Sequence, residues 1–146
     1  MSWLLGPWCL LAALTPEAAW LASLPKGVTQ LRHGGFVSAL AFTPDGKTLI
    51  SASGDRLIRL WDPAASKEVH RLEGHTAAVV SLALTPDGKR LASGGADRTV
   101  RVWDLAGRKE VRRIEGHRRD VTSLAFSPDG TQLASADGDR FTPRFT

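Results

Sequence analysis

One feature constrains the fold of this chain more than any other: the sequence repeats itself every 42 residues. His33, His75 and His117 mark the three copies, and residues 33–74 match residues 75–116 without a gap at 23 of 42 positions. A third, incomplete copy runs from residue 117 to residue 146. Repetition of this length is typical of proteins whose similar units stack side by side, because no unit can bury its apolar face alone.

Each copy has the pattern of short β-strands separated by tight turns. In the second copy we expect four strands, over Val79–Leu84, Arg90–Ser93, Thr99–Trp103 and Lys109–Ile114. Thr85–Gly88 joins the first two strands, with a Pro that presets φ and a Gly that can take positive φ. Gly94–Asp97 is expected to form the next turn, and Thr99–Trp103 alternates with a period of two. Each full copy is therefore predicted to be a four-stranded antiparallel meander.

The unit resembles the WD repeat. The motifs that carry the resemblance are Gly74-His75, Gly116-His117, Trp61-Asp62, Trp103-Asp104 and the turn Ser/Thr-Pro-Asp-Gly at 43–46, 85–88 and 127–130. The resemblance covers about residues 28–140. It implies an all-β fold, a partial β-propeller of consecutive four-stranded antiparallel blades. We expect a propeller domain over 28–146, with repeats at about 33–74, 75–116 and 117–146.

The sequence departs from this pattern at both ends of the repeat region. The first copy has Arg32-His33 in place of Gly-His, and the third stops keeping the pattern after Asp139-Arg140. Phe145 stands where the other copies have Trp, and Pro143 falls where a central strand would need an N–H. The last blade is therefore expected to lack its third and fourth strands, or to have a defective third strand.

The resemblance also implies a role for four recurring polar residues. In WD repeats a loop His, a second-strand Ser or Thr, a turn Asp and a third-strand Trp form a buried hydrogen-bonded tetrad. The corresponding sets here are His33, Ser51, Asp55 and Trp61; His75, Ser93, Asp97 and Trp103; and His117, Ser135 and Asp139 without a Trp. His75, Ser93 and Asp97 also have the residue types of a hydrolase triad. One set per blade favours a structural role, so we expect no catalytic residue and no enzyme activity.

The sequence shows no signature of a metal or cofactor site. Equivalent histidines on successive blades should lie well apart, and Cys9 is the only cysteine. Gly34-Gly35 and Gly94-Gly95 are not followed by the helix that phosphate capture needs. We therefore expect no metal and no cofactor.

Basic residues cluster near the end of the second copy, in a chain whose net charge is +4. The cluster comprises Arg108, Lys109, Arg112, Arg113, Arg118 and Arg119. It either protects an outer strand from edge pairing or forms a contact patch for an acidic protein, an anionic lipid or a nucleic acid. Arg118, Arg119 and Asp120 break the repeat, so we expect any partner contact there. Nucleic acid is not an expected partner, because no aromatic-rich basic stretch accompanies the charge.

Residues 1–27 form a hydrophobic leader or helical segment that precedes the repeats. Trp3–Leu14 is an apolar run of 12 residues, too short to cross a bilayer and about right for a signal-peptide core. No Lys or Arg precedes Lys26, and no clear cleavage site follows the run. Thr15-Pro16-Glu17 has the features of a helix start. The segment is either an export signal or membrane-surface anchor, with contact through residues 1–24, or a leader that packs elsewhere. Localisation stays open between cytoplasm and export.

These features together predict a non-catalytic protein–protein interaction scaffold. The alternative is a truncated or assembly-dependent fragment of a larger propeller with no independent function. Two full blades and part of a third leave apolar end faces and strand edges uncovered, and such faces favour association. Expected partners are therefore other proteins, further copies of the chain, or other propeller repeats.

Overall fold

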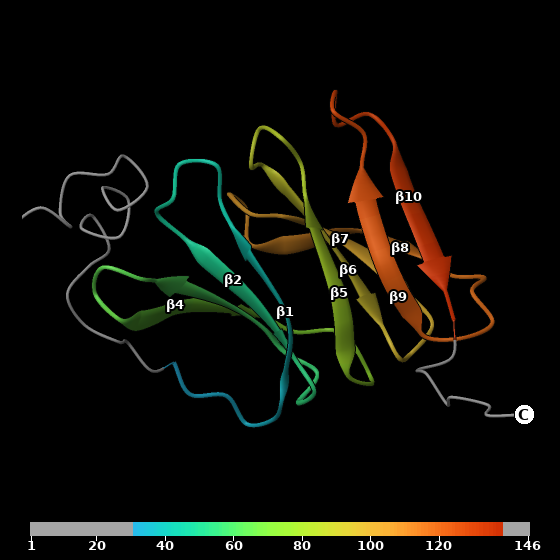
Figure 1. Cartoon of the computed structure of the whole chain (residues 1–146), viewed down its shortest axis with the longest axis horizontal. Helices are drawn as coiled ribbons and strands as arrows, with labels where there is room; N and C mark the ends of the chain where they lie inside the picture. The colour runs from blue at the N-terminus through green and yellow to red at the C-terminus, as the bar shows by residue number, and fades with distance from the viewer. Residues whose placement is uncertain (1–30, 139–146) are drawn as a thin grey trace, which may run out of the picture.

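Ten β-strands make up the regular structure of residues 31–138, the part of the chain that the computed structural model describes (Figure 1). They are β1 (Val37–Phe42), β2 (Leu49–Ser53), β3 (Ile58–Asp62), β4 (Lys67–Leu72), β5 (Val79–Leu84), β6 (Arg90–Gly95), β7 (Val100–Asp104), β8 (Lys109–Ile114), β9 (Val121–Phe126) and β10 (Leu133–Asp137). The predictions for the leader, Asp139 and Pro143 lie outside these residues.

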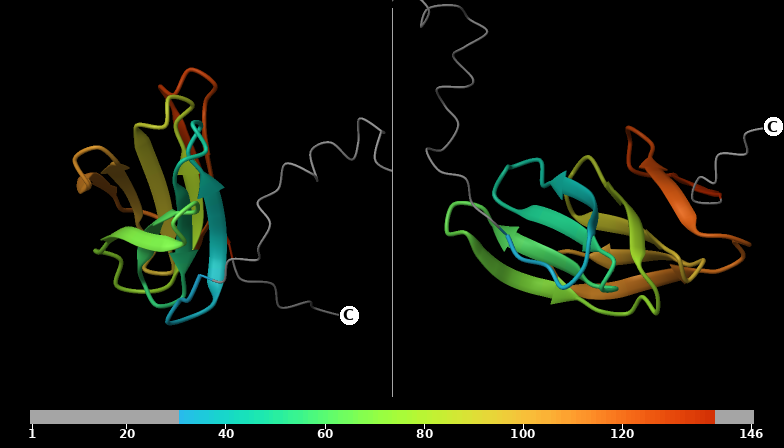
Figure 2. Two further views of the ribbon diagram at one scale, coloured as in Figure 1. Left: turned by 90° about the vertical axis from the view of Figure 1, so that its left-hand side faces the viewer. Right: turned by 60° about the horizontal axis from the view of Figure 1, so that its bottom comes forward.

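The strands form three antiparallel sheets whose strand order follows the chain. The first sheet is β1-β2-β3-β4, the second is β5-β6-β7-β8, and the third is the pair β9-β10. The three sheets lie side by side, with β1 next to β5 and β5 next to β9 (Figures 1 and 2). The predicted all-β fold of consecutive four-stranded blades is therefore confirmed, and we refer to the sheets as blades 1, 2 and 3.

The predicted strand bounds in the second repeat agree with the structure at β5 and β8 and differ at β6 and β7. Gly94 and Gly95, expected in a turn, belong to β6 and pair with Ser81 and Val79 of β5. The reason is crowding at both positions: a Cβ added to Gly95 would lie 2.6 Å from Nδ1 of His75 in the same blade. A Cβ added to Gly94 would lie 2.6 Å from Cγ1 of Val121. Glycine stands at these two positions because side chains of the same blade and of the next blade approach the strand closely, not because the chain turns there.

The Ser/Thr-Pro-Asp-Gly turns share one hydrogen-bond pattern. In the first, the Thr43 hydroxyl donates to Oδ1 of Asp45 at 2.6 Å, and the N–H of Lys47 donates to the same oxygen at 3.0 Å. Gly46 takes the positive φ of 69° that the turn requires. The turns at 85–88 and 127–130 repeat these contacts. Each turn therefore fixes the register between the first two strands of its blade.

The core lies between blades as well as within them. Ile50, Ile58 and Leu72 of blade 1 belong to one buried cluster with Val79 and Leu91 of blade 2. A sheet that is covered on both faces needs apolar side chains pointing both ways. This is why the inner strands are nearly continuous apolar runs.

The inner strands are also joined by hydrogen bonds from blade to blade. The Ser38 hydroxyl donates to the Val79 carbonyl at 2.5 Å, and the Ser81 hydroxyl donates to the Val121 carbonyl at 3.0 Å. Ser38 is the residue that the β1–β2 ladder skips, whereas Ser81 pairs with Gly94 directly after the corresponding shift in the β5–β6 ladder. A serine in or next to the bulge thus donates to the next blade in both cases.

Candidate functional site

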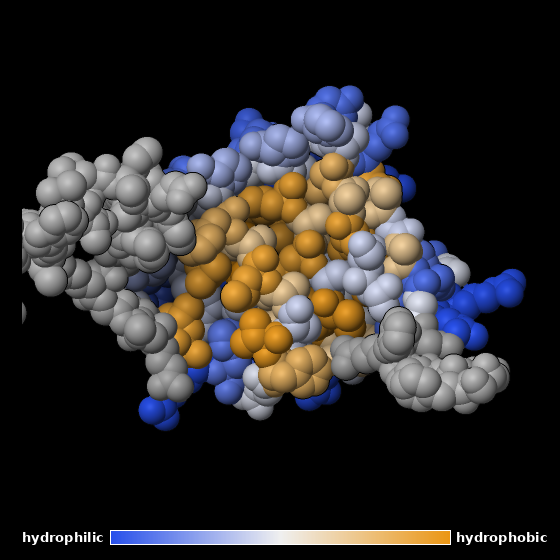
Figure 3. Space-filling view, in the orientation of Figure 1, coloured by the Kyte–Doolittle hydropathy of each residue, from blue (hydrophilic) through white to orange (hydrophobic). Residues whose placement is uncertain are grey.

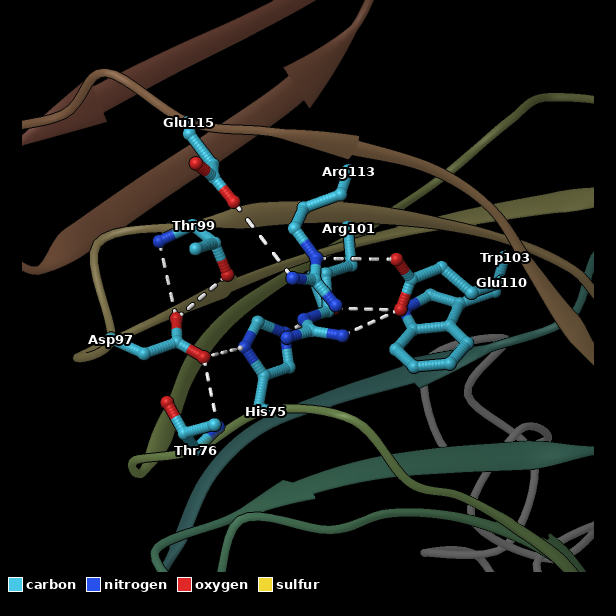
Figure 4. Close-up of polar contacts among 10 residues, drawn as sticks. His75, Thr76, Asp97, Thr99, Arg101, Trp103, Glu110, Arg113 and Glu115 are labelled. Carbon is cyan, nitrogen blue, oxygen red and sulfur yellow. Dashed lines mark hydrogen bonds and ion pairs between the residues drawn. The ribbon is translucent and has the colours of Figure 1, made fainter.

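Blade 2 brings together all four residues that the repeat pattern predicts. Trp103 Nε1 donates to Ser93 Oγ at 2.8 Å, and the ring of His75 lies on the other side of that oxygen, with Nε2 at 2.8 Å. The opposite ring nitrogen of His75, Nδ1, is 2.9 Å from Oδ2 of Asp97 (Figure 4). The same carboxylate oxygen accepts the N–H of Thr76 at 2.9 Å. One polar chain thus runs from the third strand through the second to the loop before β5.

The partners determine which atoms of this chain carry protons. A carboxylate only accepts hydrogen bonds, so Nδ1 of His75 is the protonated nitrogen. Nε2 then accepts from the Ser93 hydroxyl, which itself accepts from Trp103. Ser93 is fully buried, and Trp103 and His75 are 2% and 7% exposed. Every link therefore has a partner where water is excluded.

The electrostatics keep the His75 ring neutral and Asp97 ionised at neutral pH. Burial lowers the pKa of His75 below its ordinary value of 6.5, although the hydrogen bond to Asp97 opposes this. Burial raises the pKa of Asp97, but its hydrogen bonds, led by the one from the Thr76 N–H, outweigh burial and bring the pKa to about 2. A neutral donor therefore serves a charged acceptor, which strengthens the bond.

Blade 1 keeps the first half of the same network and changes the second half. His33 Nε2 lies 2.7 Å from Ser51 Oγ, and Trp61 Nε1 donates to that oxygen at 2.7 Å. Asp55 instead forms an ion pair with Arg59 at 2.7 Å. Burial raises the pKa of Asp55, but the Arg59 hydrogen bond and others lower it to about 2.

Blade 3 has the same beginning and an unexpected acceptor. His117 Nε2 is 2.8 Å from Ser135 Oγ, as in the other blades. The carboxylate beside the ring belongs to Asp137, whose Oδ2 is 3.4 Å from Nδ1 of His117. Asp139, which stands at the 42-residue spacing, lies outside the described residues. Sequence reasoning missed Asp137, and the nearby pair Asp137 and Asp139 was the signal that two candidates existed.

The three aspartates share one further contact, with the loop that leads into the blade. Each accepts the N–H of the residue that follows the histidine. The pairs are Gly34 with Asp55 at 3.1 Å, Thr76 with Asp97 at 2.9 Å, and Arg118 with Asp137 at 2.9 Å. The carboxylate thus holds the backbone that leads into the first strand of its blade.

A second set of charged residues, also missed by sequence reasoning, lies beside the network. Arg59 and Arg101 are buried on third strands, at 7% and 3% exposure. Each pairs with a glutamate on the fourth strand: Arg59 Nε with Glu68 at 3.3 Å, and Arg101 Nη1 with Glu110 at 2.6 Å. Buried arginines need such partners. The signal was an Arg and a Glu nine residues apart in both repeats.

The network has the connectivity of a serine hydrolase triad but not its accessibility. In such a triad the Ser oxygen must reach a substrate carbonyl. Ser93 has no exposed surface, and its oxygen already accepts from Trp103. Within residues 31–138 no group of three or more His, Cys, Asp or Glu residues could hold a metal ion. No helix in that range is long and apolar enough to cross a membrane.

Comparison with known proteins agrees with this geometry. The family model described as "WD domain, G-beta repeat" matches residues 26–62, 66–104 and 108–141. The chain belongs to the WD-repeat family. The resemblance inferred from its spaced motifs is therefore confirmed, and WD repeats imply a role in protein interaction.

Individual WD-repeat relatives match over shorter stretches. The probable serine/threonine-protein kinase PkwA of Thermomonospora curvata is 55% identical over 38 residues, 26% of this chain and 5% of that protein. The general transcriptional corepressor TUP1 of Saccharomyces cerevisiae is 43% identical over 60 residues, 37% of this chain and 8% of that protein. The solved structure of U3-55K superposes with a TM-score of 0.69 and 30% identity, covering 72% of this chain and 34% of that chain. The chain thus spans a small part of each relative.

The WD-repeat loop from Glu115 to Asp120 carries the residues predicted to contact a partner. The Arg118 and Arg119 side chains are exposed, while their N–H groups donate to Asp137 at 2.9 and 3.3 Å. The carbonyl of Asp120 accepts the N–H of Gly138 at 3.1 Å. The loop is therefore anchored through its backbone and presents two guanidinium groups outward.

Proposed function

We propose that this chain is a non-catalytic protein-interaction scaffold in which the tetrads shape the blades and the interblade loops contact the partner. The observation that carries the proposal is the burial of the blade 2 tetrad. Its Ser93 is fully buried and its His75 nearly so, which leaves no reactive atom of the blade 2 network open to a substrate. A network that recurs from blade to blade supports an architectural role, since a catalytic site normally occurs once.

The tetrads act on the loops through their aspartates. Asp97 and Asp137 each accept the N–H of an interblade loop, and Asp55 accepts the N–H of Gly34 in the segment that leads into β1. Loss of Asp97 would leave the Thr76 N–H without its partner and His75 without its orienting group. Loss of Asp55 would remove the acceptor of the Gly34 N–H and one ion pair of Arg59. The tetrads therefore fix the backbone conformation of the loops, and the side chains of the loops determine which partner binds.

The loop between β8 and β9 is the contact site that we favour. Arg118 and Arg119 replace the uncharged Thr76 and Ala77 of the preceding repeat, while the backbone contact to an aspartate is kept. Two exposed guanidinium groups on a fixed backbone suit carboxylate ligands, because guanidinium binds them with two parallel hydrogen bonds. The partner class is thus an acidic protein segment.

The test is to measure binding of the 146-residue chain to an array of acidic peptides. Arg118→Ala/Arg119→Ala should weaken binding about tenfold, because two surface contacts of up to about 1 kcal/mol each are lost. Lys109→Ala/Arg112→Ala is the matched control. It removes the same charge from exposed positions on β8 and should leave binding unchanged. Equal loss in both variants would show that net charge matters and the loop does not.

A further inference from the structure

The interface between neighbouring blades occurs twice within the described residues and uses the same valine position, with donor serines that stand one position apart in the repeat. Val79 of blade 2 packs against blade 1, and Val121 of blade 3 packs against blade 2; both are fully buried. In each case the valine carbonyl accepts a hydrogen bond from a serine of the preceding blade, Ser38 or Ser81. The chain therefore shows what one blade requires from the next.

Blade 1 presents the incoming half of this interface without a described partner. Val37, two repeats before Val121, is 43% exposed, whereas Val79 and Val121 are both 0% exposed. Leu40 and Phe42 are 61% and 58% exposed on the same strand. Figure 3 shows apolar residues gathered over the face along which β1, β5 and β9 run. Val37, Leu40 and Phe42 are apolar residues of the kind that fill the core between blades, yet in blade 1 they are exposed.

Blade 3 presents the outgoing half. A Cβ added to Gly94 of blade 2 would lie 2.6 Å from Val121. The residue of blade 3 that corresponds to Gly94 is Ala136 of β10, which is exposed. Ser81, the donor to the Val121 carbonyl, corresponds to the exposed Ser123 of β9. The surface that receives a valine and a carbonyl in blade 2 is thus present and uncovered in blade 3, within the described residues.

We propose that a second copy of this chain docks head to tail, with its blade 1 covering β9 and β10 of the first copy. Val37 of one copy then packs on Ala136 of the other, and the Ser123 hydroxyl donates to the Val37 carbonyl. Ala136 suits this role because Ala52, its counterpart in blade 1, is fully buried in one cluster with Val79. The interface continues the blade 1–blade 2 and blade 2–blade 3 contacts and is heterologous, so its two halves lie on different surfaces.

This pairing uses the blade faces, whereas the proposed partner contact uses the loop at residues 118–120. Either proposal, acidic-peptide binding by the loop or self-association by the blade faces, can therefore be disproved without affecting the other. Arg118→Ala/Arg119→Ala should leave self-association unchanged, and a change that blocks self-association should leave acidic-peptide binding unchanged.

The experiment is size-exclusion chromatography with light scattering over a dilution series of the full chain. The wild type should form concentration-dependent oligomers. Val37→Asp and Ala136→Arg should each shift the chain to smaller species, because each destroys one half of the interface. Val69→Asp is the matched control: Val69 is also 43% exposed but lies on the outer strand β4, so its oligomers should match those of the wild type.

Mixing the two interface variants gives the decisive outcome. Each variant keeps one intact half, so Val37→Asp mixed with Ala136→Arg should form a one-to-one dimer that neither forms alone. Leu40→Asp with Ala134→Arg is a second pair, for use if circular dichroism shows that a first variant is unfolded. Ala134 is exposed on β10, whereas its counterparts Ile50 and Ala92 are fully buried. A monomeric wild type at every concentration, an unaltered Val37→Asp oligomer, or a mixture without heterodimer would overturn the proposal.

Discussion

Blades 2 and 3 carry the same serine at the centre of their second strand, and the two serines have opposite environments. Ser93 of β6 is fully buried, whereas Ser135 of β10 is exposed. Ala92 and Ala134 beside them differ in the same way. Strand β6 has β7 at its side and blade 3 against its face, while β10 pairs only with β9 among the described strands. Burial in this fold is a property of neighbours, not of the local sequence.

The hydrogen bond between histidine and serine is nearly the same in blades 2 and 3, although the two serines differ in burial. The His–Ser distance is 2.8 Å in both, for His75 with Ser93 and for His117 with Ser135. The local sequence therefore creates the polar contact, and the neighbouring strands decide how much it stabilises. A hydrogen bond exchanged with water contributes little, whereas a buried group without its partner costs its full desolvation penalty.

The largest expected effect concerns the tryptophan that blade 2 adds to this contact. Trp103 is 2% exposed and belongs to the buried cluster between blades. Trp103→Ala should lower the free energy of unfolding by about 3–5 kcal/mol, through lost burial and the cavity that remains. Urea denaturation followed by circular dichroism measures this loss.

The control for this change is Val111→Ala on the outer strand β8. Val111 is 48% exposed, so its truncation should change the free energy of unfolding by no more than about 0.5 kcal/mol. A loss below about 1 kcal/mol for Trp103→Ala would mean that the ring is not part of a packed core.

The strands and the family were predictable because their signals are local. The alternation of Thr99–Trp103 and the turn at Thr85–Gly88 depend on a few adjacent residues, and the 42-residue period multiplies each signal. The strand bounds at Gly94 and Gly95 were not predictable in this way. Glycine usually marks a turn. Here Gly94 marks the approach of Val121 from the next blade, and Gly95 marks the approach of His75 from the loop before β5.

Two parts of the candidate site escaped sequence reasoning for a related reason. Strict spacing selects Asp139 for blade 3, but the described acceptor beside His117 is Asp137, two residues earlier. The buried Arg59 and Arg101 contradict the usual exposure of arginine, because their glutamate partners stand on an adjacent strand. Cross-strand pairing depends on register, which periodicity alone does not specify.

The next effect tests the contrast between the two serines directly. Ser93→Ala leaves Trp103 Nε1 and a ring nitrogen of His75 without partners in a buried site, and should cost about 1–3 kcal/mol of unfolding free energy. Ser135→Ala makes the same chemical change on the exposed β10 and should cost less than about 0.5 kcal/mol. Both are measured by urea denaturation. Equal losses would break the comparison, because they would show that β10 is as well covered as β6.

The smallest expected effect is a pH dependence that arises from the buried His75. Its pKa in the folded chain is below 6.5, so the unfolded chain binds more protons and stability rises with pH in this range. The contribution of neutral His75 to the free energy of unfolding is complete above pH 6.5 and is lost as the pH falls toward the pKa of His75 in the folded chain. Asp97, with a folded pKa of about 2, adds a second loss as pH falls through 3.8. Urea denaturation at a series of pH values should therefore show a decline below pH 6.5 that is smaller in His75→Gln. Parallel profiles for the two proteins would mean that His75 titrates as freely in the folded blade as in the unfolded chain, and that burial does not distinguish blade 2 in this respect.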